Sequence, residues 1–184
     1  MSTGAAELGA IYDDAIRPAL RLLPGPMTSR EALVMMFAIG LQESRMVHRY
    51  QLVLGPDGKE QHNDDGTVKK GAARGLFQFE QGGGVKGVMT HPSSKSHAFT
   101  VLGALGHMEI TEHAVWQALE TDDVLAAAFA RLLLWTDSKP LPKTDNPWGA
   151  WDCYLRVWRP GRPHHHTWME FHAEAVMTVM ELFQ

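Results

Sequence analysis

The feature that most constrains the fold of this chain is an apolar segment, from Thr28 to about His48, that ends in a carboxylate. Nearly every residue from Ala32 to Leu41 is apolar, so a helix formed here must be buried on most of its circumference. Thr28 and Glu31 have the spacing of a capping box, which predicts the start of this helix. We therefore expect the rest of the chain to pack around it.

Glu43 lies near the end of this predicted helix and continues its apolar stripe, because Ile39 and Gly40 precede it by four and three positions. Burial disfavours the ionised form of a carboxylate, so its pKa should be raised. Such a group suits a general acid working near neutral pH. The alternative is a carboxylate at a helix end that turns to solvent or pairs with Arg45 or Arg49.

Length and composition indicate one globular domain covering residues 1–184. The chain is 45% hydrophobic and 21% charged, which allows a substantial core. Its net charge of −4, without a basic stripe, argues against a nucleic-acid partner. No apolar run is long enough to span a bilayer, and the N-terminus lacks the pattern of a secretory signal.

The single cysteine, Cys153, excludes an intramolecular disulfide and is expected to be a small buried apolar group. Ten histidines are present, including His164, His165 and His166, but none has the spacing of a recognised zinc site. We therefore expect neither a functional metal nor a cofactor.

Periodicity and turn signals predict a mainly α fold of the α+β kind, with a small β lobe. The predicted helices cover residues 5–23, 28–48, 95–108, 111–119, 121–135, 146–158 and 165–183. Thr121 and either Asp145 or Asn146 are expected at helix starts. A polar β-meander of about residues 50–70 is expected from strands at 50–54, 59–63 and 67–70, separated by turns at Gly55–Gly58 and Asp65–Gly66.

The segment 71–87 is rich in glycine, which lets a backbone turn sharply and approach a ligand closely. A flexible loop is the alternative interpretation. Leu76, Phe77 and Phe79 argue instead that the middle of the segment is anchored in the core.

Two segments, one on each side of the predicted meander, carry motifs that occur together in a known family. Gln42-Glu43-Ser44-Arg45 closes the apolar helix, and Ala73-Arg74-Gly75-Leu76-Phe77-Gln78-Phe79 follows the meander. The pair resembles the lysozyme superfamily, in particular the soluble lytic transglycosylase and goose-type lysozyme branches. There a helix ends in Glu-Ser, and a later Gly-Leu-x-Gln segment lines the sugar cleft. The resemblance covers about residues 28–80 and implies a lysozyme-like fold whose β lobe lines a glycan cleft.

This resemblance implies a role for Glu43 as the acid that protonates the glycosidic oxygen between N-acetylmuramic acid and N-acetylglucosamine. Peptidoglycan glycan strands would be the partner, bound by a monomer. The substrate-binding residues that the resemblance implies, together with a candidate from a later helix, are Ser44, Gly75, Leu76, Gln78, Phe79 and Tyr154.

The resemblance leaves two reaction types open. In the transglycosylase route the muramic acid's own C6 hydroxyl attacks, and no second carboxylate is essential. In the hydrolytic route a second carboxylate activates water or stabilises the cation. The candidates for that group are Asp57, Glu60, Asp64, Asp65 and Glu80, although aspartates at turns are also favoured for backbone reasons.

One departure from the family concerns a tyrosine near the catalytic acid. Lytic transglycosylases of this type carry an Ala-Tyr-Asn segment, whereas the closest stretch here has Phe129 in the tyrosine position. Tyr154 could supply the hydroxyl from the next helix. The helical spacing of Tyr154 with Trp151 and Trp158 also fits packing into the core.

The resemblance also implies a biological setting, that of a bacteriophage or prophage endolysin. Such a protein would stay in the host cytoplasm until lysis and then act on the cell wall, without inserting into the membrane. It would depend on a separate holin-type protein for release. The alternatives are a muramidase, a glycan-binding or virion protein that kept the fold without turnover, and a metal-dependent wall amidase or endopeptidase.

Overall fold

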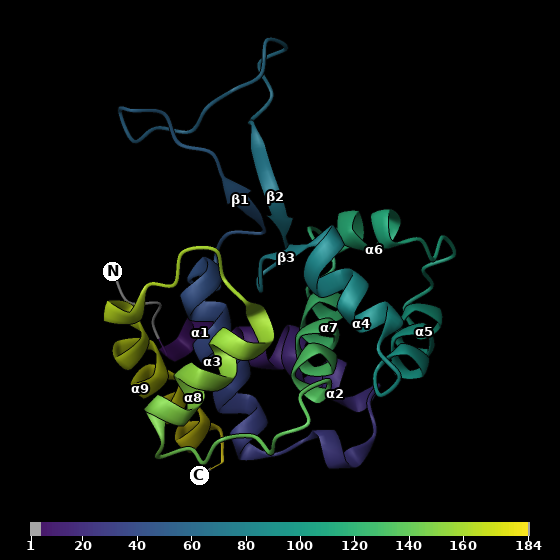
Figure 1. Cartoon of the computed structure of the whole chain (residues 1–184), viewed down its shortest axis with the longest axis vertical. Helices are drawn as coiled ribbons and strands as arrows, with labels where there is room; N and C mark the ends of the chain where they lie inside the picture. Colours follow the sequence, from purple (N-terminus) through teal and green to yellow (C-terminus); the bar gives the residue numbers. More distant parts are fainter. Residues whose placement is uncertain (1–4, 184) are drawn as a thin grey trace.

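The computed structural model describes residues 5–183 and shows a mainly helical chain with one small antiparallel sheet (Figure 1). The mainly α prediction is confirmed; residues 1–4 and 184 of the predicted domain lie outside the described part. The helices are α1 (Ala5–Ile11), α2 (Arg17–Arg21), α3 (Arg30–Ser44), α4 (Lys86–Thr90), α5 (Lys95–Ala104), α6 (Glu112–Ala118), α7 (Asp123–Trp135), α8 (Pro147–Trp158) and α9 (His165–Leu182). The strands are β1 (Tyr50–Leu52), β2 (Lys70–Arg74) and β3 (Phe79–Glu80).

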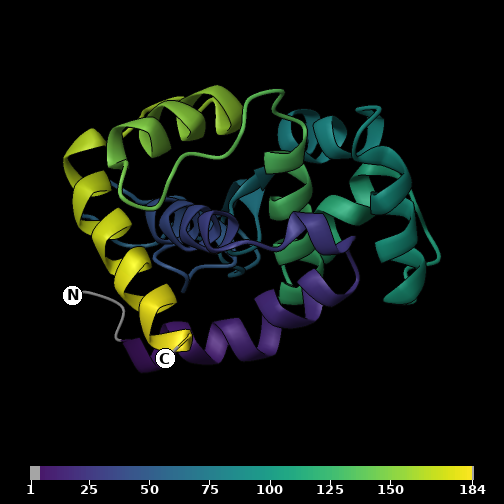
Figure 2. The same cartoon turned by 90° about the horizontal axis from the view of Figure 1, so that it is seen from below.

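Helix α3 lies at the centre of the helical body, as its composition predicts. Every residue from Ala32 to Leu41 is buried. Figure 2 shows α1, α2, α7, α8 and α9 arranged around it. Because burial of apolar surface is the main favourable term in folding, this helix provides the core against which the others pack.

The start of α3 differs from the prediction. Ser29, not Thr28, caps the helix, its hydroxyl accepting a hydrogen bond of 3.1 Å from the backbone N–H of Ala32. The physical reason is a 3₁₀ turn at Gly25–Met27, which includes a hydrogen bond from the Thr28 N–H to the Gly25 carbonyl. The capping box at Thr28 was therefore wrong by one residue.

The end of α3 also comes earlier than predicted, at Ser44. Arg45 and Met46 both have left-handed backbones, with φ of 58° and 56°. Two such residues in succession end the helix and turn the chain sharply. This turn leaves Glu43 in the last turn of α3.

The remaining predicted helices are confirmed within a few residues, with two differences. Asp122, not Thr121, caps α7, whereas Asn146 caps α8 as one of the two predicted options. The short helix α4 was not predicted, because glycines dominate the sequence around it. The helix buries Val88 and Met89, and this burial compensates for the low helix propensity of the glycines.

The predicted β-meander is confirmed only in part, because its segments pair through isolated bridges while the regular sheet is formed by β1, β2 and β3. Strand β1 pairs with β2, and β2 pairs with β3, both antiparallel. The predicted second and third strands, 59–63 and 67–70, pair only through the isolated bridges Leu54–Glu60 and His62–Val68, except that Lys70 belongs to β2. Their side chains are mostly exposed and provide no apolar face to bury, so the strong partner of β1 is the start of the glycine-rich segment.

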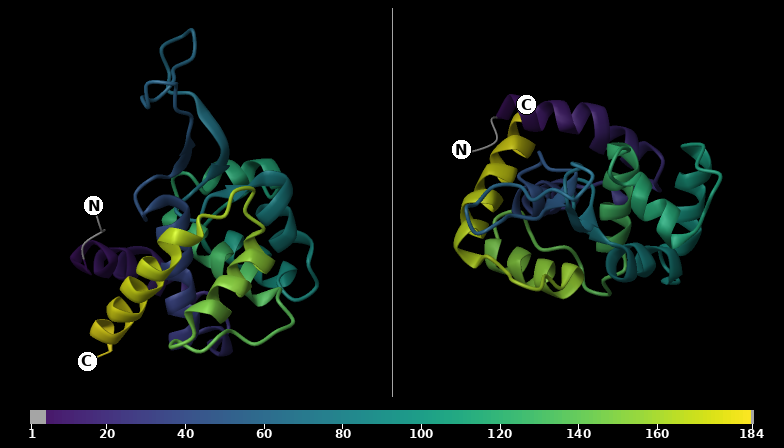
Figure 3. Two further views of the ribbon diagram at one scale, coloured as in Figure 1. Left: turned by 60° about the vertical axis from the view of Figure 1, so that its left-hand side comes forward. Right: turned by 90° about the horizontal axis from the view of Figure 1, so that it is seen from above.

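The loop between β1 and β2 projects from the helical body, as Figure 1 and the left view of Figure 3 show. The glycine-rich segment behind it is anchored, because Leu76, Phe77 and Phe79 are buried. Within the described part of the chain, no helix combines the length and apolar character needed to cross a membrane.

Candidate functional site

Glu43 lies in the wall of a pocket of about 580 Å³ that is formed by segments far apart in the sequence. The end of α3 forms one wall, the sheet forms another, and the end of α8 with the loop before α9 forms the third. The lining residues are Gln42, Glu43, Gln51, Ala73, Gln78, Glu80, Tyr154, Trp158, Arg159, Pro160, Gly161, Arg162 and His164.

The carboxylate of Glu43 is half-buried and has a raised pKa. Burial is the main cause and raises the pKa to about 7. The hydroxyl of Tyr154 donates a hydrogen bond of 2.7 Å to Glu43 Oε1, which lowers the pKa, and the negative charge of Glu80 raises it. Near neutral pH both protonation states are populated, as a group that must give and take a proton requires.

Tyr154 is a rigid donor toward this carboxylate. Its ring is buried and stacks on Trp168, with ring centroids 5.0 Å apart and an interplanar angle of 18°. Burial and the adjacent charge of Glu43 raise the pKa of the Tyr154 hydroxyl, so it stays protonated. Because its hydrogen bond occupies Glu43 Oε1, the acidic proton of Glu43 is favoured on Oε2. The sequence left two roles open for Tyr154, packing in the core and a hydroxyl near the candidate acid. In the structure its ring is buried and its hydroxyl contacts Glu43.

Ser44 supports the site without lining the pocket. Its buried hydroxyl donates a hydrogen bond of 2.6 Å to the Leu76 carbonyl and accepts one of 3.1 Å from the Met46 N–H. These bonds fasten the end of α3 to the segment that follows β2. Ser44 therefore fixes the position of Glu43 relative to the opposite wall.

Gly75 makes the turn after β2 possible. It has a φ of +75°, and a Cβ atom at this position would lie 2.7 Å from the Leu119 carbonyl oxygen. Its N–H donates a hydrogen bond of 2.8 Å to the Arg49 carbonyl. Only glycine fits this combination of backbone angle and close approach.

Leu76 and Phe79 lie behind the pocket wall. Leu76 is fully buried, and Phe79 packs edge-on against Phe129, with ring centroids 6.4 Å apart. Phe129 is therefore a core residue. The family that the sequence resembles has a tyrosine at the position of Phe129. In this chain the hydroxyl near Glu43 belongs to Tyr154 on α8.

Of the residues predicted to bind substrate, Gln78 and Tyr154 line this pocket, whereas Ser44, Gly75, Leu76 and Phe79 do not. Phe79 instead lines the adjoining pocket described below. Gln78 is held by a hydrogen bond of 2.9 Å from its Nε2 to the Gly75 carbonyl. Its φ of 50° is unusual for a residue other than glycine, and such conformations concentrate at functional sites.

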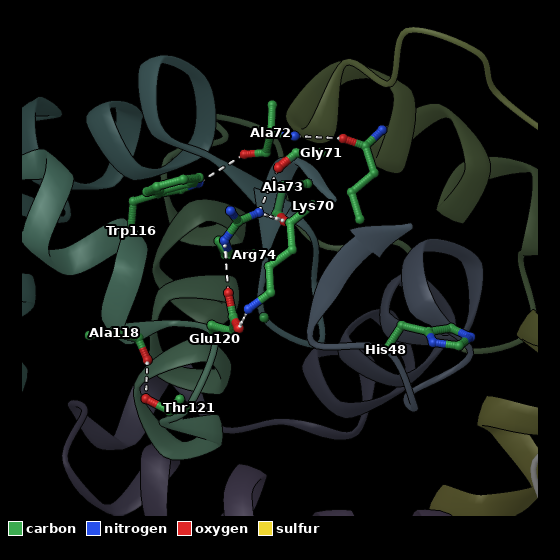
Figure 4. Close-up of polar contacts among 12 residues, drawn as sticks. His48, Lys70, Gly71, Ala72, Ala73, Arg74, Trp116, Ala118, Glu120 and Thr121 are labelled. Carbon is green, nitrogen blue, oxygen red and sulfur yellow. Dashed lines mark hydrogen bonds and ion pairs between the residues drawn. The ribbon is translucent and has the colours of Figure 1, made fainter. Parts of the chain in front are cut away.

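The sheet wall of the pocket is fixed from its far side. Ala73 lines the pocket, and the next residue, Arg74, points the other way toward Glu120, with 2.9 Å between Arg74 Nε and Glu120 Oε2. Lys70 also bonds Glu120, and the Arg74 guanidinium lies 4.3 Å from the centre of the Trp116 ring (Figure 4). This network ties β2 to the region of α6.

The four aspartate and glutamate candidates on the loop lie away from the pocket. Asp57, Glu60, Asp64 and Asp65 are all exposed, and none lines the pocket. Asp57 and Asp65 accept backbone hydrogen bonds two residues ahead, which is a turn-forming role. Glu80 is the candidate that the structure brings to Glu43.

The sequence did not single out the wall contributed by the loop between α8 and α9. Gln42 holds this loop, because its Nε2 donates a hydrogen bond of 3.1 Å to the His164 carbonyl. Arg159 and Arg162 add positive charge at the rim. The Pro160-Gly161 dipeptide is a signal for a turn, but nothing local indicates which helix that turn faces.

A second pocket of about 640 Å³ adjoins this one and shares Glu80, Trp158 and Arg159 with it. It continues over the glycine-rich segment 82–87. The two pockets meet along these shared side chains, which gives a depression with Glu80 near its middle.

Within residues 5–183, no three histidine, cysteine, aspartate or glutamate side chains are grouped so that they could hold a metal ion. The sequence matches no family model, and comparisons with curated proteins and with solved structures gave no significant match.

Proposed function

We propose that this protein is a peptidoglycan-degrading glycosidase that cleaves the β-1,4 bond between N-acetylmuramic acid and N-acetylglucosamine. The proposal combines the motif resemblance with one observation, the half-buried Glu43 whose pKa is about 7 and whose Oε1 accepts the Tyr154 hydroxyl. A protonated carboxyl on a pocket wall is what the departure of a sugar oxygen requires. The lysozyme-like character of the fold belongs to the same proposal.

The proposed reaction is of the lytic transglycosylase type. Protonated Glu43 gives its proton to the glycosidic oxygen as the bond to the muramic acid C1 breaks. The resulting Glu43 carboxylate then takes the proton of the C6 hydroxyl as that oxygen attacks C1. The products are a free N-acetylglucosamine hydroxyl and a 1,6-anhydro muramic acid end, and Glu43 returns to its protonated form.

Hydrolysis is the second candidate reaction, and the position of Glu80 favours it. Glu80 is exposed, lines the same pocket, and acts electrostatically on Glu43. A second carboxylate so placed could activate a water molecule, which would then attack C1 in place of the C6 hydroxyl. The product would carry a reducing muramic acid end.

The test is mass spectrometry of purified peptidoglycan after digestion by the wild-type protein and by Glu43→Gln, Glu80→Gln and Glu170→Gln. Anhydro ends that persist in Glu80→Gln and disappear in Glu43→Gln support the proposed route. Reducing ends that are lost in both variants support hydrolysis. Glu170 is an exposed residue of α9 and serves as the control. Intact glycan with the wild-type protein would refute both reactions and favour a binding role.

We further propose that the protein is a monomeric phage or prophage endolysin, released to the wall by a holin-type protein. This setting rests on the resemblance alone. It predicts that the chain expressed in a bacterial cytoplasm lyses the cells only when a membrane-permeabilising protein is co-expressed. Equal lysis with and without that protein would contradict it.

A further inference from the structure

We infer that a separate pocket at the start of α3 binds a small oxyanion, such as phosphate or a carboxylate, through the buried side chain of Arg131. This pocket has a volume of about 440 Å³. It is formed by the first turn of α3, the second half of α7 and the loop 137–143. Glu43 lies at the other end of α3, so the inference is independent of the proposed function.

Arg131 is a buried cation without a counter-ion among the described residues. Its side chain is only 2% exposed, and its Nε donates a hydrogen bond of 2.5 Å to the Met27 carbonyl. Its Nη1 is buried and has no hydrogen-bond partner within the described chain. A buried, unpaired guanidinium group is costly, and a bound anion would remove that cost.

Two further features of Arg131 agree with a site that lacks its anion. Burial lowers the pKa of the guanidinium to about 10, with no acidic group raising it. The Trp135 ring partly compensates its charge by a cation–π contact, with the ring centre 5.1 Å from Arg131 Cζ. Trp135 is itself part of the pocket wall.

The other charged groups of the pocket leave it positive. Lys139 and Lys143 add two exposed cations to Arg131, and Glu31 and Asp137 contribute two carboxylates. Both carboxylates are already engaged. Glu31 lies 3.6 Å from Lys143 Nζ, and Asp137 accepts a hydrogen bond of 2.5 Å from an arginine outside the pocket, Arg156. The charge of Arg131 therefore has no carboxylate free to balance it.

The geometry favours an oxyanion over a halide ion. A guanidinium group presents several N–H donors in one plane, which match the spacing of two oxygens on a phosphate or carboxylate. Lys139 and Lys143 line the same pocket and add positive charge, and the start of α3 adds the positive end of a helix dipole. A bound oxyanion would join α3, α7 and the loop 137–143.

The experiment measures thermal unfolding of the full chain while inorganic phosphate is titrated at constant ionic strength. Binding to the folded state should raise the Tm with a saturable dependence, by on the order of 5 °C when phosphate exceeds its Kd 100-fold. Arg131→Met, which keeps the side-chain length without the charge, should lose this saturable rise. Arg17→Gln removes an exposed arginine from α2 and should keep it.

Two further measurements guard against general salt effects and against a variant that does not fold. The Nε–H signal of Arg131 in a ¹⁵N spectrum should shift along the same saturation curve. Lys139→Gln combined with Lys143→Gln, both at exposed positions, should weaken phosphate binding several-fold. Parallel titrations with sulfate and with acetate distinguish a tetrahedral oxyanion from a carboxylate as the preferred ligand.

The inference would be overturned by a linear, non-saturating rise in Tm that is equal in wild type and Arg131→Met. Equal phosphate affinity in wild type and in the double lysine variant, or an unmoved Arg131 Nε–H signal, would overturn it as well. Loss of peptidoglycan cleavage would not bear on it, because no residue of this pocket lines the pocket of Glu43.

Discussion

At the scale of single residues, the site depends on the environment that the fold gives to one carboxylate. Burial moves the pKa of Glu43 from its ordinary value of 4.5 to about 7, and the Tyr154 hydroxyl limits that rise. The same residue type on the loop, at Glu60, remains exposed. The chemistry that we propose is therefore a property of the position and not of the residue type.

Glu43 should make the stability of the protein depend on pH. Its pKa is higher in the folded state than in the unfolded state, so the folded protein binds more protons between about pH 4.5 and 7. Stability should therefore fall as the pH rises through this window. Glu43→Gln should lack this loss and exceed wild type at pH 8 by on the order of 3 kcal/mol. Urea unfolding at several pH values measures it.

The same substitution should abolish most glycan cleavage, by roughly 10²–10⁴-fold, because the proton donor is removed. Glu170→Gln should leave both activity and the pH dependence of stability unchanged. Parallel stability curves for wild type and Glu43→Gln would contradict the shifted pKa.

Tyr154→Phe should raise the pKa of Glu43 further, since it removes the hydrogen bond that stabilises the carboxylate. The alkaline limb of the pH–activity profile, which reports deprotonation of Glu43, should move to higher pH. Tyr12→Phe serves as the control, because Tyr12 lies in the segment between α1 and α2 and does not line the pocket. An unmoved alkaline limb in Tyr154→Phe would show that this hydrogen bond does not act on the catalytic proton.

At the scale of elements, the turn between β2 and β3 decides where Gln78 lies. Gly75 permits the left-handed backbone and the close approach to Leu119, and Ser44 fastens the same segment to the end of α3. Neither residue lines the pocket. They hold the wall formed by the end of α3 in a fixed position relative to the wall formed by the sheet.

Gly75→Ala should destabilise the protein by roughly 2–4 kcal/mol, because a Cβ atom adds a clash with the Leu119 carbonyl to the strain of a left-handed alanine. Gly66→Ala is a matched control. Gly66 also has a positive φ, of 82°, but nothing lies within 4 Å of the added Cβ atom. Its cost should be near 1 kcal/mol, from backbone strain alone. Equal losses in urea unfolding would show that the contact with Leu119 can relax.

At the scale of the whole molecule, the helical body and the projecting loop have separate roles. The pocket is built from α3, the sheet, α8 and the loop after it, while residues 55–66 extend away from the body (Figure 1). The Arg74–Glu120 contact holds the base of the sheet against the region of α6. The loop beyond that base makes no contribution to the pocket wall.

Neutralising the four loop carboxylates, with Asp57→Asn, Glu60→Gln, Asp64→Asn and Asp65→Asn combined, should therefore leave glycan cleavage unchanged. Their positions are exposed and outside the pocket, so the stability of the body should change by less than about 1 kcal/mol. The assay is release of soluble fragments from purified peptidoglycan. A large loss of activity with an intact fold would return the second catalytic group to the loop.

The sequence alone determined the elements whose signal is local. The apolar run of α3 can only be stable when enclosed, so its central place and the burial near Glu43 followed from the order of residues. The cap of α8, narrowed to Asp145 or Asn146, and the anchoring of Leu76 and Phe79 were likewise visible in short stretches.

Only the tertiary structure decided which distant groups meet. Tyr154 reaches Glu43 across 111 positions in the chain, and Glu80 joins them from the sheet. The pairing of β1 with β2 and the burial of Arg131 without a counter-ion also depend on how the elements pack. Packing angles and loop paths set these contacts, and no short stretch of sequence specifies them, because each is stabilised by residues contributed from several elements at once.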